Sequence, residues 1–356
     1  MIELQNEKER KQYIKKHIAQ VWKRWFGEDL AHFVDEEIGG GILNYVYRVA
    51  SDGKVVYLKQ ALENVKHEGK IGKDLASIPK ERLQYEEKYI ETIRPLLPRE
   101  IELPEILLYD AENNILALSD VKRNGILLEK SMLNGNFNKN TAYLLGKFLG
   151  IQNKKTIGKN IVIRGSEEND IENWHLFLNM RTRGILQRGE FSDSVKEEVE
   201  RMYQMAKDKY TYKVVMNTDC CPKNVFERKD GIGLVDFEQA TGAGDPAYDL
   251  GFLIGHYLIM SVIRKDKMFD AINAIRKIMD GYNEEMNLLK DNNHDERLIK
   301  YAGMIILYRI SSSSPAPYID RSNTKLISKM KEIAFELITK SFAKFDDALN
   351  YMLQCS

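Results

Sequence analysis

The feature that most constrains the fold of this 356-residue chain is a change of pattern near residue 120. Before it, short runs rich in β-branched and aromatic residues alternate with turn signals, which is typical of a small sheet. Beyond it, apolar residues recur at helical spacing over long stretches. We therefore predict an α+β protein with two lobes: a small β-rich N-terminal lobe over residues 1–120 and a larger, mainly helical C-terminal lobe over residues 121–356.

Local signals predict the individual elements. Residues 4–27 carry apolar residues at helical spacing and predict an amphipathic opening helix. Ser51-Asp52-Gly53 is a turn signal between two strands. The other expected elements are a helix over residues 79–93, strands over 105–108 and 115–118, helices over 139–152 and 193–209, short strands over 213–216 and 231–237, and helices from Pro246 onward.

Charge and cysteine content narrow the class of protein. Lysine plus arginine and aspartate plus glutamate each number 53, so the formal charge is zero, which argues against a nucleic-acid partner. The longest apolar run, Phe252–Ile263, spans about 12 residues and predicts a buried helix and no membrane partner. Three cysteines, two of them adjacent, make a disulfide framework improbable. With no secretory signal pattern at the N-terminus, we expect a cytoplasmic protein.

Acidic and amide side chains follow β-like runs within residues 214–251. Asp219 follows one run, Asn224 comes five residues later, and Asp236 ends the next short strand. Phosphoryl transfer from ATP needs a carboxylate at the acceptor hydroxyl and oxygen ligands for Mg²⁺. We interpret Asp219 as the catalytic carboxylate and Asn224 and Asp236 as metal ligands, with Glu238 as a direct ligand or its support. Loop aspartates and asparagines often form only turns, so the combination carries this hypothesis.

The N-terminal lobe offers a second group of candidates in kinase order. Gly39-Gly40-Gly41 precedes a β-like run, and glycine amides can approach phosphate oxygens. Lys59 lies in a later strand and is expected on the ATP phosphates, held by Glu86 of the next helix. Adenine is expected at the backbone near residues 117–120, which include Ser119. Alone, three glycines or one strand lysine would indicate a turn or a solvated edge.

The 214–251 segment resembles the aminoglycoside phosphotransferase and choline kinase group. That group's pattern is His-Gly-Asp, four residues, Asn, a strand ending Asp-x-Glu or Asp-x-Asp, and then Gly-Asp-Pro-x-x-Asp-Leu. The matching residues here are Asp219, Asn224, Asp236, Glu238, Gly244, Asp245, Pro246, Asp249 and Leu250. The resemblance implies a bilobed protein-kinase-like fold, ATP and Mg²⁺ as cofactors, and a structural role for Asp249 beneath the catalytic loop. Asn217 and Thr218 replace the usual histidine and glycine.

The N-terminal lobe resembles the methylthioribose kinases more closely. The matching residues are Gly39, Gly41, Leu43, Asn44, Val46, Lys59, Gln60, Ala61 and Leu62, so Asn44 joins the expected nucleotide-site residues. Those kinases carry two arginines late in the chain that reach the sugar; here Tyr308 stands in place of the first, and Arg309 is the expected acceptor contact. The resemblance implies a small-molecule hydroxyl acceptor, with a sugar or sugar-like alcohol preferred.

Several alternatives stay open. An aminoglycoside or choline-type amine is the second choice of acceptor, for which the acids of residues 283–295 offer a lining. The Asn217-Thr218 departure leaves room for a catalytically weak nucleotide-binding scaffold of the spore-coat type. Cys220-Cys221 could form a redox switch, although small packing residues are the commoner role. A homodimer and the use of GTP are also left open.

Overall fold

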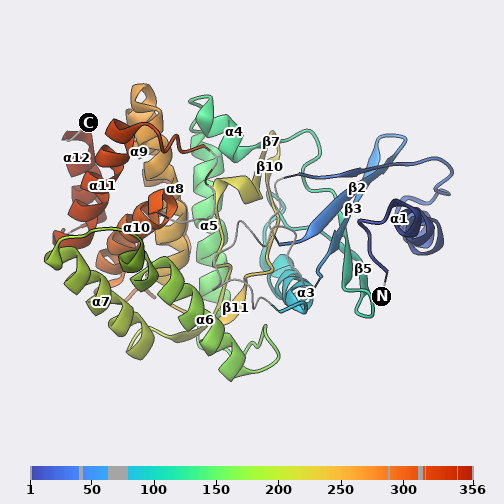
Figure 1. Ribbon diagram of the computed structural model, residues 1–356, viewed down its shortest axis with the longest axis horizontal. Coiled ribbons are helices and arrows are strands. Elements are labelled where there is room, and N and C mark those ends of the chain that lie inside the picture. The colour runs from blue at the N-terminus through green and yellow to red at the C-terminus, as the bar shows by residue number, and fades with distance from the viewer. Residues whose placement is uncertain are drawn as a thin grey trace.

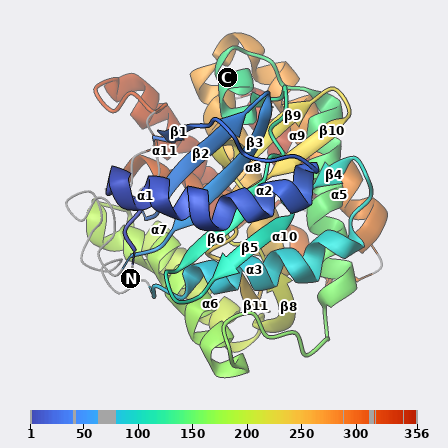
Figure 2. The same ribbon diagram turned by 90° about the vertical axis from the view of Figure 1, so that its right-hand side faces the viewer.

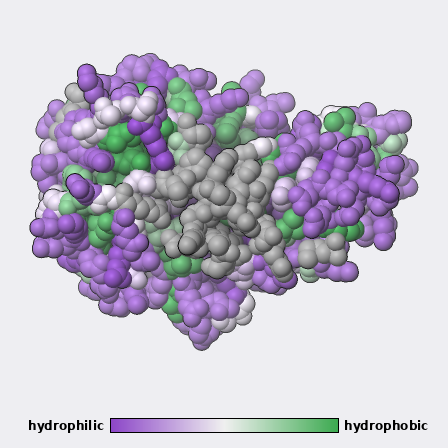
Figure 3. All heavy atoms as spheres, in the orientation of Figure 1, coloured by the Kyte–Doolittle hydropathy of each residue, from purple (hydrophilic) through white to green (hydrophobic). Residues whose placement is uncertain are grey.

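The computed structural model describes residues 2–39, 43–62, 79–287, 289–311, 316, 318–342 and 344–354. A β-rich part and a helical part lie at opposite ends of the molecule (Figure 1). The predicted α+β class is therefore confirmed. Hydrophilic residues cover most of the face seen in Figure 3, interrupted by separate apolar patches.

The β-rich part is built on a five-stranded antiparallel sheet in the order β1-β2-β3-β6-β5. Its strands are β1 (Val34–Glu37), β2 (Tyr45–Ser51), β3 (Lys54–Gln60), β5 (Ile106–Asp110) and β6 (Ile115–Ser119). The predicted turn joins β2 to β3, with Asp52 at φ 48° and Gly53 at φ 77°. Two successive left-handed residues match the twist of a tight hairpin, which explains Asp-Gly at this point.

The two faces of this sheet are covered by different helices. The opening helix consists of α1 (Glu7–Tyr13), a π-helical turn (Ile14–Ile18) and α2 (Ala19–Phe26), and it crosses one face (Figure 2). In β6, Ile115 and Ala117 pack on that side, while Leu116 and Leu118 join the core that contains α3 (Arg82–Ile93). The alternation follows the two-residue period of a strand.

The helices expected over residues 139–152, over 193–209 and from Pro246 onward are present. They are α5 (Lys139–Thr156), α7 (Asp193–Asp208), α8 (Pro246–Ile263), α9 (Met268–Met286), α10 (His294–Ser311), α11 (Thr324–Thr339) and α12 (Phe345–Gln354). The short α4 (Leu128–Leu133) and α6 (Glu167–Arg181) are not among the predicted elements. Within the described residues, only α8 is long and apolar enough to cross a membrane, and 94% of it is buried inside the protein. It is a core helix, as the sequence predicts.

Helices α5 and α9 meet at two glycines. A Cβ atom on Gly146 would lie 1.9 Å from the carbonyl oxygen of Ile278, and one on Gly281 would lie 2.1 Å from that of Tyr143. Since real side-chain atoms do not approach a backbone oxygen so closely, only glycine allows the two helix backbones to come together here.

Two small sheets carry the segment with the candidate site. Strands β8 (Tyr212–Met216) and β11 (Thr241–Gly244) pair with each other, and a second sheet has the order β4-β10-β9-β7. In that sheet β10 (Gly231–Leu234) pairs in parallel with β4 (Ile101–Glu102), antiparallel with β9 (Val225–Arg228), and β9 pairs with β7 (Ile126–Leu127). Strand β4 precedes residue 120 and β10 follows it, so their pairing crosses the predicted lobe boundary. The boundary itself stays a prediction.

Candidate active site

Lys59 lies at the centre of three carboxylates. Its Nζ atom is 2.7 Å from Glu86 Oε2, 2.5 Å from Asp236 Oδ1 and 3.3 Å from Glu238 Oε2. The lysine comes from β3, Glu86 from α3, and the other two acids from the loop between β10 and β11. Lys59, Glu86 and Glu238 are almost fully buried, whereas the Asp236 side chain is 33% exposed. Residues far apart in the sequence thus converge on one ammonium group.

Burial and charge act in opposite directions on this cluster. Burial by itself would lower the pKa of Lys59, but the three acids raise it well above its ordinary value, so the lysine stays charged. Burial also raises the pKa of Glu86, and Lys59 only partly opposes that effect. Carboxylate oxygens of Glu86, Asp236 and Glu238 come within 4.8 Å of one another. Such a set of hard oxygen donors fits Mg²⁺.

A buried chain of contacts links the glycine-containing loop to this cluster. The Asn44 amide group donates a hydrogen bond to Glu238, and Asn44 Oδ1 accepts one from Arg82 Nε at 2.7 Å. Arg82 Nη2 also donates to the carbonyl oxygens of Leu43 and Leu62, at 3.0 and 3.3 Å. Asn44 therefore lies beside the acids, and Arg82 fixes it there. Its role at a nucleotide stays a prediction.

Other expected nucleotide-site residues are placed differently. Gly39 follows β1 and is exposed, while Gly40 and Gly41 lie outside the described residues. Ser119 ends β6, which has a paired strand on each side, and its hydroxyl accepts a hydrogen bond from the Glu105 amide at 2.8 Å. Its side chain is thus used within the sheet. Asp120 is the first residue whose backbone lies beyond the paired part of β6.

Asp219 lies in the loop after β8, 8% exposed, with polar partners on both carboxylate oxygens. Oδ2 accepts a hydrogen bond from Asn224 Nδ2 at 3.2 Å and lies 3.4 Å from Lys223 Nζ. Oδ1 lies 3.3 Å from Arg181 Nη2 and 3.8 Å from Arg309 Nη2. Burial would raise the pKa of Asp219, but Lys223, Arg181 and Arg309 together hold it below the ordinary value. The carboxylate is therefore ionised at neutral pH.

Asn224 is positioned toward Asp219. Its Nδ2 donates to both the carbonyl oxygen and Oδ2 of Asp219, at 3.0 and 3.2 Å. Its backbone oxygen accepts from the Val235 amide at 3.0 Å, which ties the loop to the chain just before Asp236. A metal contact from Asn224 would have to use Oδ1. Glu86 lies close to the expected metal ligands Asp236 and Glu238 and is also paired with Lys59, the partner that the sequence suggested for it.

The two unusual residues before Asp219 are both accommodated by hydrogen bonds. Asn217 Oδ1 accepts from the Asp219 amide at 3.1 Å. Thr218 has φ 61°, a left-handed conformation that favours glycine, and its hydroxyl donates to the Gln239 carbonyl at 2.8 Å. The backbone amides of Asn217 and Thr218 both donate to Asp249, at 2.8 Å each. Asp249 thus lies beneath the loop, in the position that the family resemblance implies.

The structure gives less support to the remaining candidate residues. Burial raises the pKa of both Cys220 and Cys221, which opposes thiolate formation and a redox switch.

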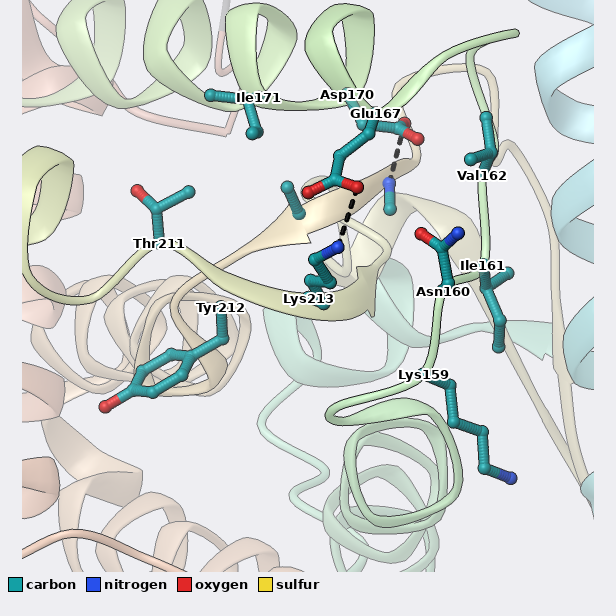
Figure 4. Close-up of a pocket in the computed structure, with 12 residues that line it drawn as sticks. Lys159, Asn160, Ile161, Val162, Glu167, Asp170, Ile171, Thr211, Tyr212 and Lys213 are labelled. Carbon is teal, nitrogen blue, oxygen red and sulfur yellow. Dashed lines mark hydrogen bonds and ion pairs between the residues drawn. The ribbon is translucent and has the colours of Figure 1, made fainter.

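Several acids of residues 283–295 are paired with nearby cations in the Lys147–Glu284, Lys154–Glu285, Lys290–Asp295 and Arg297–Asp291 ion pairs. A separate hollow has a volume of about 90 Å³, and the Lys213 and Glu167 side chains that line it are 2.7 Å apart. Figure 4 shows how these lining residues lie. The hollow is lined by none of the predicted site residues.

Sequence reasoning missed two cations beside Asp219. Arg181 ends α6, and its Nη1 donates to the Thr218 carbonyl and, at 3.2 Å, to the Tyr248 hydroxyl. Lys223 stands four residues after Asp219 in the loop. A basic residue near Asn224 could have been suspected from the loop itself, but no local signal marks an arginine 38 residues upstream.

The fold of the chain is similar to that of a solved phosphotransferase. The structure of macrolide 2'-phosphotransferase type I superposes with a TM-score of 0.50 at 11% identity, covering 96% of this chain and 100% of that one. This chain has a protein-kinase-like fold. Spectinomycin phosphotransferase, solved with ADP and spectinomycin, gives a TM-score of 0.49 at 14% identity and covers 95% of this chain and 98% of that one. The kinase-like fold expected from the sequence is confirmed.

Sequence similarity is more limited than the likeness of the kinase fold. Methylthioribose kinase 1 of Oryza sativa subsp. japonica is 29% identical over 109 residues, which is 31% of this chain. The chain thus matches about a quarter (24%) of the length of that relative. No protein-family model matches the chain.

Proposed function

We propose that this protein is an ATP- and Mg²⁺-dependent phosphotransferase that transfers the γ-phosphate to a hydroxyl group of a small molecule. The observation that carries the proposal is the convergence of Lys59 with Glu86, Asp236 and Glu238, together with a separate ionised Asp219 bonded to Asn224. The protein-kinase-like fold supports it. We further propose that the protein works in the cytoplasm.

Each group has a distinct role in this proposal. Lys59 would contact the ATP phosphates, with Glu86 holding its ammonium group in place. Asp236 and Glu238, with Asn224 as the expected third member, would hold Mg²⁺, which when bound neutralises charge on the phosphates. Asn44 and the glycines from 39 to 41 would lie at the nucleotide, and the adenine would bind at the backbone around Asp120.

Asp219 would act on the acceptor. Ionised at neutral pH, it can accept a hydrogen bond from the acceptor hydroxyl, orient the attacking oxygen and take its proton as the new O–P bond forms. Because its pKa is held low, orientation contributes more than basicity. Asn224 keeps the carboxylate in place through its amide.

A sugar or sugar-like alcohol is the acceptor that we prefer. The short similarity to methylthioribose kinase 1 supports this choice, and Arg309 lies 3.8 Å from Asp219, within reach of an acceptor. The amine alternative has less support, because the acids named for residues 283–295 are held in ion pairs. The hydrogen bonds of Asn217 and Thr218 favour an active loop over an inert scaffold.

The test is nucleotide turnover with purified protein over sugars, amino alcohols and aminoglycosides, with ATP and GTP compared. We expect ATP turnover on at least one polyol, its abolition by EDTA, and a large loss in Asp219→Ala. Asp230→Asn, at an exposed turn acid, serves as the matched control. Tight Mg·ATP binding without turnover on any acceptor would instead support the scaffold, and unchanged activity of Asp219→Ala would reject the assignment.

A further inference from the structure

The charge around Asp219 is asymmetric. Three cations, Arg181, Lys223 and Arg309, lie within 3.8 Å of its carboxylate oxygens. Among the other described acids, Glu129 on α4 attracts both Lys223 and Arg309 electrostatically. Asp236 also attracts Lys223, but it is already paired with Lys59. His256 accepts a hydrogen bond from Arg309 Nε at 3.2 Å, which requires its Nε2 atom to be unprotonated. The acceptor side of Asp219 therefore carries excess positive charge.

The three cations are not equivalent. Arg181 is fixed by the Thr218 carbonyl and the Tyr248 hydroxyl, so its role is to hold the loop. Arg309 donates through Nε to His256, and its guanidinium lies over the Phe252 ring. Among the described residues, the one hydrogen bond or ion pair of its terminal nitrogens is the long 3.8 Å contact to Asp219. The Lys223 side chain is 50% exposed. Arg309 and Lys223 thus keep donors that a ligand beside Asp219 could use.

We propose that the acceptor carries an anionic group, a carboxylate or a phosphate, close to the hydroxyl that is phosphorylated, and that Arg309 and Lys223 bind this group. The inference rests on the proposed function and deepens it. In the reaction the acceptor oxygen bonds to the γ-phosphorus of ATP, the bond from that phosphorus to the β–γ bridging oxygen breaks with its electrons leaving on ADP, and the hydroxyl proton passes to Asp219.

An amine acceptor fits these surroundings poorly. It would bring a further positive charge within reach of three cations, and like charges at such distances repel strongly in a partly buried site. A neutral polyol would leave the donors of Arg309 and Lys223 with weaker partners. An acidic polyol, by contrast, supplies the negative charge that the pair lacks and fixes the hydroxyl near Asp219.

The test uses matched acceptors that differ only in one end group: glycerol, glycerate and glycerol 3-phosphate, and ribitol, ribonate and ribitol 5-phosphate. We expect kcat/KM for the better anionic member of a series to exceed that of the neutral member by about 10- to 100-fold, the value of one or two charge-assisted hydrogen bonds. Comparing the carboxylate with the phosphate identifies which anion is bound. The ratio should shrink as salt is raised from 50 to 500 mM.

Variants separate acceptor binding from general damage. Lys223→Gln, at a half-exposed side chain, should reduce the anionic-to-neutral ratio of kcat/KM about tenfold, mainly through KM for the acceptor. Glu129→Gln should raise the same ratio, because it removes an acid that competes for both cations. A merely structural role for these residues would change both acceptors alike and leave the ratio where it was.

The outcomes distinguish this inference from the function beneath it. Equal or better turnover of the neutral members overturns the anionic acceptor and leaves the kinase intact. Absence of Mg·ATP binding, measured by calorimetry, overturns the proposed kinase. If nucleotide binds and nothing turns over, calorimetry with the same six compounds decides: tighter binding of the anionic members supports the inference, and equal or absent binding refutes it.

Discussion

Replacing Asp219 with asparagine removes one negative charge and almost no volume. Asparagine can still occupy the space between Asn224 and Arg181, but it neither accepts a proton nor balances the cations around it. Loss of a general base lowers a rate by about 10²–10⁴. Since the pKa of Asp219 is held below its ordinary value, it is a weak base, and we expect the lower half of that range, about 10²–10³ in kcat, or about 3–4 kcal/mol in the barrier.

The same substitution should change stability but not nucleotide binding. Arg181 and Arg309 would lose their shared counter-ion in a site where Asp219 is only 8% exposed. Removing one member of a buried pair costs about 3–5 kcal/mol, and each kcal/mol lowers the melting temperature of a protein this large by about 1–2 °C. Lys59 and its acids have no contact with Asp219, so KM for ATP should stay within about twofold.

The assay is a coupled ADP-release measurement beside a thermal melt with and without Mg·ATP. Asp230→Asn is the control, because Asp230 is 60% exposed and pairs with Arg228 and Arg123, so its loss should cost less than about 1 kcal/mol. If Asp219→Asn stays folded, binds Mg·ATP and loses less than tenfold in kcat, the proposed role of Asp219 is wrong.

Three further predictions follow from the packing and the buried charges. Lys59→Met should lower the melting temperature and raise KM for ATP. Added MgCl2 should restore part of the lost stability, because the metal replaces the missing positive charge. No response of the melting temperature to MgCl2 would contradict a site that the lysine and the metal share. Activity should fall as pH drops below about 6, because burial raises the pKa of Asp249 to about 6 and the protonated acid accepts fewer hydrogen bonds from the loop. If activity falls only below pH 4.5, the protonation of Asp249 is not the cause. The raised pKa also means that the contribution of Asp249 to stability is present below pH 3.8 and lost as pH rises through 6, a sign that a pH series of melts can check. Gly146→Ala should lower the free energy of unfolding by about 1–3 kcal/mol, because its Cβ would meet the Ile278 carbonyl. Gly158→Ala, at an open but left-handed turn, should cost only the backbone strain of about 1–2 kcal/mol. Equal stability of wild type and Gly146→Ala would refute the packing argument.

Much of the fold could be predicted because its signals are local. The Asp52-Gly53 turn, the apolar period of the opening helix and the apolar run of α8 each depend on neighbours in the sequence. The pairing of Lys59 with Glu86 was also accessible, since the order of glycines, strand lysine and helix glutamate limits the possibilities. These are features that a single segment encodes.

The missed contacts are of another kind. Arg181 reaches Asp219 from the end of α6. Arg82 donates to Asn44, which in turn donates to Glu238. Such contacts depend on how helices pack, and the same arginine in the same local sequence could equally face solvent. Thr218 is a further example: its left-handed backbone follows from the loop that Asp249 and Gln239 hold, and a threonine there gives no sequence signal for it.

The attachment of α3 bears on how a nucleotide could leave. Tyr89 of α3 bonds to Gln152 of α5 and stacks on Phe237, and the chain after α3 enters β4, which is paired with β10. Helix α3 is thus fastened to the helical part, while Lys59 belongs to the five-stranded sheet. If product release requires the sheet to swing away, Lys59 must part from Glu86, Asp236 and Glu238, and Asn44 must part from Glu238. The speed of ADP departure would then be set by this whole cluster of buried contacts.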